Sequence, residues 1–448
     1  KALSTPGVLS NLRELNLSYN DIEADGVSKL SSALSNGALG SLQFLNLDGN
    51  QISDAGMKSF SDAIAMGALA TLQVLALNSN KIDDTGMKAF SSALSSGVMG
   101  SLQKLYLWDN QIGDSGMIAF ADAIKPTDEI PMGSLPSLVG LSLSDNQIGD
   151  KGMIAFADAI KPTDEIPMGA LASLTNLHLD RNQIGDDGMI AFADAIKPTD
   201  EIPMGSLALL KELILNENKI GDEGMCAFSS ALSSGSLALL KELILNENQI
   251  GDEGMCAFSS ALSSGAMGSL QQLWLQGNQI GDGGMIAFAE ALKPNSNFPM
   301  GSLASLEVLS LWGNQIGDTG MIAFADAIKP TDEFPMGAPL ANLTNLRLGN
   351  NQIGDEGMKA FSSALSSGSL GSLQTLSLEI NYIGDEGMKH FSTAISNGAL
   401  ASLQYLSLHN NQIRDAGMIA FAEALEPTDE IPMGALASLK SLNLLKND

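Results

Sequence analysis

Apolar and polar residues follow one recurring pattern along the chain, and its clearest copy is Leu240–Gly265. In the stretch KELIL the two kinds of residue alternate, so Leu243 and Leu245 share one face, as in a short β-strand with one buried side. After this stretch, apolar residues such as Met255 and Phe258 recur at three- and four-residue spacing, which predicts an amphipathic helix. Each copy of the pattern therefore predicts one strand followed by one helix.

Three other residues of this copy mark the boundaries of the two elements. Asn248 stands where the chain must leave the strand, and its amide can bond backbone groups of the turn. Asp252 is expected to cap its own helix, with its carboxylate accepting N–H bonds of the first turn. Gly265 suits the end of the helix.

The same unit recurs over the whole chain at a spacing of 30 or 36 residues, with a single spacing of 37. The strand motifs begin at Leu12, Leu42, Leu72, Leu102, Leu138, Leu174, Leu210, Leu240, Leu270, Leu306, Leu343, Leu373, Leu403 and Leu439. This repetition predicts one solenoid over residues 1–448 with 14 strands, 13 helices and one uninterrupted sheet. Neither end shows a polar capping segment, so we expect a fragment of a longer array.

Two ladders of large apolar residues predict the core. A methionine, from Met57 to Met418, and a phenylalanine, from Phe60 to Phe421, each hold one helix position in twelve repeats. An asparagine ladder follows the strands. Residues that recur so regularly are expected to be architectural, because a catalytic or binding site needs local asymmetry.

The motif LxxLxLxxNxI followed by GDxGMxAFxxAL resembles the leucine-rich repeat, and over its whole length the chain is similar to the ribonuclease-inhibitor-like subfamily. That subfamily includes repeat domains of NOD-like receptors and of the Ran GTPase-activating protein. The resemblance implies a right-handed α/β solenoid with parallel strands on the concave face and helices on the convex face. Strands about 4.8 Å apart, backed by helices about 10 Å apart, must also curve the stack in this sense.

Six repeats carry an insertion between the helix and the next strand, for example KPTDEIPMG at Lys125–Gly133. Its first proline ends the helix. In three consecutive repeats the acidic residues of the insertion are expected to form a strip, which is either solvated or a weak site for cations or a basic partner. Its members are Asp128, Glu129, Asp164, Glu165, Asp200 and Glu201.

Net charge is −28, from 23 basic and 51 acidic residues, which argues against nucleic acid as a partner. The charge serves solubility or attracts a basic protein. Cys226 and Cys256 are too few for a disulfide framework and are interpreted as free thiols in a reducing, cytoplasmic compartment. No apolar run reaches the roughly 20 residues of a membrane span.

No catalytic, metal or cofactor motif stands out. Glycine-rich phosphate loops, HExxH and GxSxG are missing, and the three histidines are scattered singly. We therefore expect no enzyme, no cofactor and no metal. The likeness to the Ran GTPase-activating protein implies regulation of a small GTPase as an alternative, although none of Arg13, Arg181, Arg347 and Arg414 aligns clearly with that family's catalytic arginine.

The informative residues are the ones that the repeat does not dictate. Residues beside the strand leucines point outward onto the expected concave face, where all three tryptophans fall. The candidate partner-binding residues are Lys104, Tyr106, Trp108, His178, Arg181, Trp274, Trp312, Arg347, Tyr405 and His409. Trp274 and Trp312 are expected to form one apolar platform with a cationic edge at Arg347, and Lys104, Tyr106 and Trp108 a second cluster.

Tryptophan, tyrosine and arginine dominate the energetics of protein interfaces. The sequence thus predicts a scaffold that binds a protein through its strand face, as a monomer or as a subunit of a hetero-complex. Aromatic packing without a ligand and a structural or assembly subunit with an acidic shell remain as alternatives.

Overall fold

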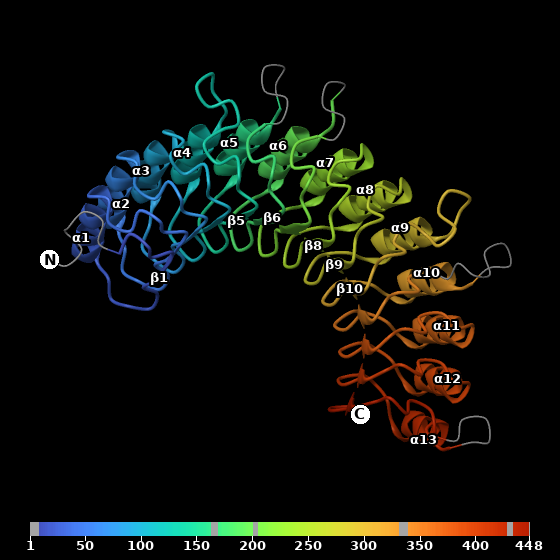
Figure 1. Ribbon diagram of the computed structural model, residues 1–448. Coiled ribbons are helices and arrows are strands. Elements are labelled where there is room, and N and C mark those ends of the chain that lie inside the picture. Colours follow the sequence, from blue (N-terminus) through green and yellow to red (C-terminus); the bar gives the residue numbers. More distant parts are fainter. Residues whose placement is uncertain (1–8, 163–168, 200–204, 331–338, 428–432, 448) are drawn as a thin grey trace. The chain divides into compact units, whose positions relative to one another are not determined.

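The computed structural model describes residues 9–162, 169–199, 205–330, 339–427 and 433–447. Within these ranges, 14 strands of three residues alternate with 13 helices, as the repeat pattern predicts (Figure 1). The chain forms two compact units. The first consists of residues 1–220 and 234–239, and the second of residues 221–233 and 240–448.

The first unit contains seven strands and six helices. These are β1 (Glu14–Asn16), α1 (Ala24–Ser35), β2 (Phe44–Asn46), α2 (Asp54–Ala65), β3 (Val74–Ala76), α3 (Asp84–Leu94), β4 (Lys104–Tyr106), α4 (Asp114–Ile124), β5 (Gly140–Ser142), α5 (Asp150–Ile160), β6 (Asn176–His178), α6 (Asp186–Ile196) and β7 (Glu212–Ile214).

The second unit contains seven helices and seven strands. These are α7 (Asp222–Ser233), β8 (Glu242–Ile244), α8 (Asp252–Ser263), β9 (Gln272–Trp274), α9 (Asp282–Leu292), β10 (Val308–Ser310), α10 (Asp318–Ile328), β11 (Asn345–Arg347), α11 (Asp355–Ser366), β12 (Thr375–Ser377), α12 (Asp385–Ser396), β13 (Tyr405–Ser407), α13 (Asp415–Ala424) and β14 (Ser441–Asn443).

Within each unit the strands pair in parallel and in sequence order, and equivalent residues lie side by side. Leu15 pairs with Leu45 in the first unit, and Leu309 pairs with Leu346 in the second. The helices cover one face of the sheet, and the strands follow the inner side of each unit's curve (Figure 1). The expected α/β solenoid is confirmed, and the other face of the strands is left uncovered by helices.

The core lies between the strands and the helices and consists of the expected ladders. The twelve phenylalanines from Phe60 to Phe421 are the largest fully buried side chains, and the methionines from Met57 to Met388 are fully buried. Met418, in the last helix, is only half-buried. The assignment of these residues to the core is therefore confirmed.

The asparagine ladder binds backbone groups of two successive repeats. The Nδ2 atom of Asn278 donates to the carbonyl oxygens of Leu275 and Leu245, at 3.0 Å each. Its Oδ1 atom accepts from the Ile250 N–H at 3.1 Å. The expected bonds within the turn are present, and the amide also bonds the repeat before it.

The aspartate ladder differs from expectation, because in the repeats where its bonds are described the carboxylate caps the helix of the following repeat. Helix α8 has Gly251 at its N-cap, a residue without a side chain, and it is capped by Asp222 of the preceding repeat. Asp252 Oδ1 instead accepts from the N–H groups of Gly281 and Gly284, at the start of α9, at 2.7 and 2.8 Å. Glycine is needed at position 284, since a Cβ there would lie 2.9 Å from both Asp252 Oδ1 and Met255 Cβ.

The local environment shifts the pKa of two ladder members in opposite directions. N–H groups of Arg414 and Gly417 hold the pKa of Asp385 below its usual range. In the first unit, burial raises the pKa of Asp54, which accepts from the N–H groups of Asp83 and Gly86. The ladder is thus a chain of charged caps in different local environments.

The insertions are described in part. In Lys125–Gly133, Thr127 and Ile130 exchange two backbone hydrogen bonds of 3.1 Å, and Asp128 and Glu129 are exposed. The other four members of the proposed acidic strip, Asp164, Glu165, Asp200 and Glu201, lie outside the described residues. The strip therefore stays a prediction.

Phe258→Ala is expected to lower the free energy of unfolding by about 3–5 kcal/mol, because the fully buried ring leaves a cavity. Urea unfolding followed by circular dichroism measures the change. A loss below about 1 kcal/mol would contradict the assignment of Phe258 to the core.

Asp252→Ala is expected to lower the free energy of unfolding by about 0.5–2 kcal/mol, because two N–H groups at the start of α9 lose their acceptor. Hydrogen exchange should accelerate at Gly281 and Gly284. Asp252→Asn is the matched control, because it keeps an acceptor oxygen. Faster exchange in the first turn of α8 instead would show that Asp252 caps its own helix.

Candidate functional site

In the second unit, Arg347 lies over Trp274 although one strand, β10, separates their strands. Trp274 ends β9, Arg347 ends β11, and Ser310 stands in register between them on β10. Because the serine is small and buried, the guanidinium carbon of Arg347 reaches 5.1 Å from the centre of the indole ring. This is the geometry of a cation–π contact. The indole Nε1 of Trp274 also donates to Gln272 Oε1 at 3.2 Å.

Trp312 likewise contacts a residue two strands away, Glu379. Its Nε1 atom donates to Glu379 Oε1 at 3.1 Å. Gly349 lies between them, and a Cβ there would come within 2.7 Å of Trp312 Cδ1 and 2.6 Å of Glu379 Oε1. A residue without a side chain is therefore what lets the indole and the carboxylate meet.

These contacts border a hollow of about 560 Å³ on the strand face of the second unit. It is lined by Gln276, Trp312, Arg347, Thr375, Ser377, Glu379 and Tyr405. Both indole N–H groups bond polar side chains within the unit, so the surface around the tryptophans combines apolar faces with polar edges. His409 is engaged elsewhere, with Nδ1 at 2.9 Å from Ser407 Oγ and 3.1 Å from Asn443 Nδ2.

The first unit has its own cluster on the strand face. His178 Nε2 lies 3.1 Å from Glu212 Oε1, and Asn176 also donates to Glu212. Lys104 and Tyr106 line the same hollow of about 260 Å³. Trp108, 39% exposed, lines a neighbouring hollow of about 330 Å³ together with Tyr106 and His178.

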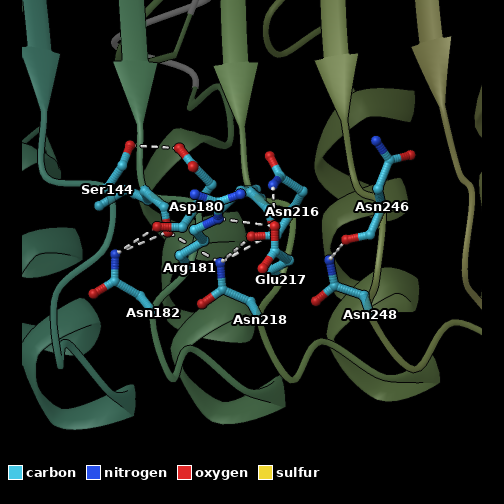
Figure 2. Close-up of polar contacts among 11 residues, drawn as sticks. Ser144, Asp180, Arg181, Asn182, Asn216, Glu217, Asn218, Asn246 and Asn248 are labelled. Carbon is cyan, nitrogen blue, oxygen red and sulfur yellow. Dashed lines mark hydrogen bonds and ion pairs between the residues drawn. The ribbon is translucent and has the colours of Figure 1, made fainter. Parts of the chain in front are cut away.

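Arg181 lies at the turn after β6, where it forms an ion pair. Its Nε atom donates to Glu217 Oε1 at 2.9 Å, and this contact raises the pKa of the guanidinium. Figure 2 shows this pair beside the hydrogen bond between Ser144 and Asp180. The pair is exposed, so its contribution to stability is small.

The structure thus gathers nine of the ten candidates on the strand faces of the two units and places Arg181 at the turns. The sequence interpretation missed Glu212, Glu379 and Gln276, which line the hollows. Each occupies an outward position like those of the named candidates. The sequence contains no signal that could have found them. An acidic or amide residue that faces outward has the same sequence pattern whether it is solvated or bonded to a side chain two strands away.

Other chemistry is sparse among the described residues. They contain no group of three His, Cys, Asp or Glu side chains that could hold a metal ion. Cys226 and Cys256 form no disulfide, and burial together with the Asp252 carboxylate raises the pKa of Cys256. No helix in the described ranges is both long and apolar enough to cross a bilayer.

The repeats identify the family. The leucine-rich-repeat family model matches residues 8–31, 41–61, 68–91, 101–121, 134–157, 170–193, 207–229, 237–259, 269–289, 302–325, 340–362 and 399–422. These segments cover more than half of the chain, which therefore belongs to the leucine-rich-repeat family. Proteins with this repeat commonly mediate protein–protein interactions, and the match indicates no enzyme family.

One solved structure supports the fold. An internalin from Listeria monocytogenes has a TM-score of 0.57 and 21% sequence identity, covering 97% of this chain and 87% of the internalin. A leucine-rich-repeat protein from Leptospira interrogans has a TM-score of 0.47 and 20% identity, covering 95% of this chain and 92% of that protein. No curated protein matches the sequence significantly.

Gly349→Ala is expected to break the Trp312–Glu379 hydrogen bond, because the new methyl group occupies their meeting place. The indole N–H signal of Trp312 should move in a ¹⁵N–¹H spectrum, while that of Trp108 stays. The control is Gly371→Ala, whose Cβ would have only the Gly368 carbonyl oxygen within 4 Å, at 3.9 Å. An unchanged Trp312 signal would contradict the observed pairing.

Proposed function

We propose that the protein is a protein-interaction module that binds its partner through the strand face. The observation that carries this proposal is the hollow of the second unit, where Trp312, Arg347 and Tyr405 gather with Trp274 adjacent. Large aromatic and arginine side chains of this kind supply most of the binding energy at protein interfaces. The strand face is also the one that the helices leave open (Figure 1).

The first unit supports the same function with a separate set of residues. Lys104, Tyr106, Trp108 and His178 line adjoining hollows on its strand face. The lining of these hollows suits recognition of a polypeptide, because it combines hydrogen-bonding side chains with aromatic and aliphatic ones. We assign Arg181 to the edge of this surface, where an ion pair contributes more to specificity than to affinity.

Five further assignments belong to this proposal. The GDxGMxAFxxAL helices favour the ribonuclease-inhibitor-like subfamily, and the unbroken series of strand motifs favours one continuous solenoid. Two cysteines that form no disulfide favour the cytoplasm. The net charge of −28 favours a partner that is basic overall, since opposite charges accelerate encounter. The module acts as a monomer or within a hetero-complex.

The double variant Trp274→Ala, Trp312→Ala is expected to weaken partner binding, with about 2–4 kcal/mol lost for each ring that is buried at the contact. Affinity capture from the native source, followed by mass spectrometry, identifies the partner. Titration calorimetry with the purified partner then measures the affinity.

The control variant is Asp128→Asn, Glu129→Gln, which neutralises two exposed charges of an insertion. It should keep its affinity. The strand-face proposal is wrong if the insertion variant loses binding while the folded tryptophan variant binds like the parent chain.

A further inference from the structure

Arg347 contacts Trp274 and Asn345 but forms no ion pair with any described residue. It is half-buried, one side of its guanidinium faces the Trp274 ring, and its Nε atom makes a long bond of 3.4 Å to Asn345 Oδ1. In the part of the chain that the structure describes, no carboxylate forms an ion pair with it. Several other cations do have such partners, as Arg181 has Glu217 and Lys389 has Glu386.

The acidic residue of the same hollow, Glu379, is already engaged. Its Oε1 atom accepts from Trp312 Nε1 at 3.1 Å, and its Oε2 atom accepts from Ser377 Oγ at 2.5 Å. Both oxygens are therefore held by the tryptophan and the serine rather than by Arg347. Arg347 lines the hollow, and among the described residues its terminal guanidinium nitrogens form no hydrogen bond, so their donors are unused.

Small neighbours decide on which side a ligand can reach Arg347. The residue stands in register between Ser310 on β10 and Ser377 on β12. Trp274 occupies the space on the β10 side. On the β12 side, Thr375, Ser377 and the 38% exposed Tyr405 line the open hollow of about 560 Å³.

We propose that this hollow binds a carboxylate that adjoins an apolar group on the partner polypeptide, either an acidic side chain or the chain terminus. The planar guanidinium of Arg347 donates two parallel N–H bonds to the two oxygens of the carboxylate. Trp312 and Tyr405 contact the adjoining apolar group, and Thr375 and Gln276 offer further hydrogen bonds. This inference rests on the proposed strand-face function and specifies what the second unit recognises.

A carboxylate fits better than a phosphate. One guanidinium balances one negative charge, whereas a phosphate carries close to two. Glu379 adds a negative charge to the same hollow and disfavours a more highly charged ligand. A partner that is basic overall can still carry such an anchor, because steering depends on net charge and the anchor on local contacts.

The test follows the Arg347 side-chain N–H and the three indole N–H signals of the ¹⁵N-labelled full chain. The probes are N-acetyl-phenylalanine for a chain terminus and acetyl-Leu-Glu-Leu-amide for a side chain. Their neutral counterparts are N-acetyl-phenylalanine amide and acetyl-Leu-Gln-Leu-amide. At least one acid should shift the Arg347 and Trp312 signals and bind about tenfold or more tightly than its amide. Propionate separates a free small carboxylate from a polypeptide source, and it should bind more weakly.

Variants complete the design. Arg347→Gln should abolish the response, and Arg13→Gln, at an exposed arginine of the first unit, should leave it intact. Glu379→Gln keeps an acceptor for Trp312 and should tighten acid binding severalfold by removing a like charge.

Equal binding of acid and amide, no response to either acid, or propionate binding as tightly as the peptides would overturn the inference. Purified partner then separates the two proposals. Partner binding that needs Trp274 and Trp312 but tolerates Arg347→Gln would reject the carboxylate site and keep the interaction function. Binding that ignores all three residues would reject the strand-face function itself.

Discussion

Backbone polar groups at the repeat junctions are the constraint on which this structure depends. Strands of three residues and tight turns leave N–H and carbonyl groups without partners in their own repeat, and burying such groups unpaired is costly. Asparagine side chains bond the preceding repeat, and aspartate side chains cap the following helix. Each repeat is thus completed by its neighbours, which explains why both residues recur so regularly.

The outward strand residues are required neither for the core nor for the junctions between repeats. The leucines point into the core, the methionines and phenylalanines fill the helix side, and the asparagines and aspartates hold the junctions. Variation can therefore collect on one face. On this face a large residue stands beside a small one on the neighbouring strand. Trp274 extends over Ser310, and Trp312 extends over Gly349. A small residue on the intervening strand is what allows a large one to find a partner two strands away.

Charge acts on two length scales in this chain. The excess of acidic residues sets a field that extends about a Debye length, roughly 8–10 Å at physiological salt, and influences which molecules approach. Inside the hollow of the second unit, contacts at hydrogen-bond distance decide what binds. There the glutamate is occupied by a tryptophan and a serine, and the arginine is the group with unused donors. An acidic protein can in this way present a local site for an anionic group.

The sequence by itself determined the elements, the core and the family. Strict periodicity reports which side of a strand or helix a residue faces, and this was enough to place Phe258 in the core, Asn278 at the turn and Trp274 on the open face. Only the tertiary structure decided which residues are partners. Asp252 caps a helix that begins in the next repeat, and Glu212 and Glu379 join sites that the sequence pattern did not reveal. The physical reason is that periodicity fixes direction within one repeat, whereas partners depend on register between strands, on the size of the residue between them and on side-chain rotamers.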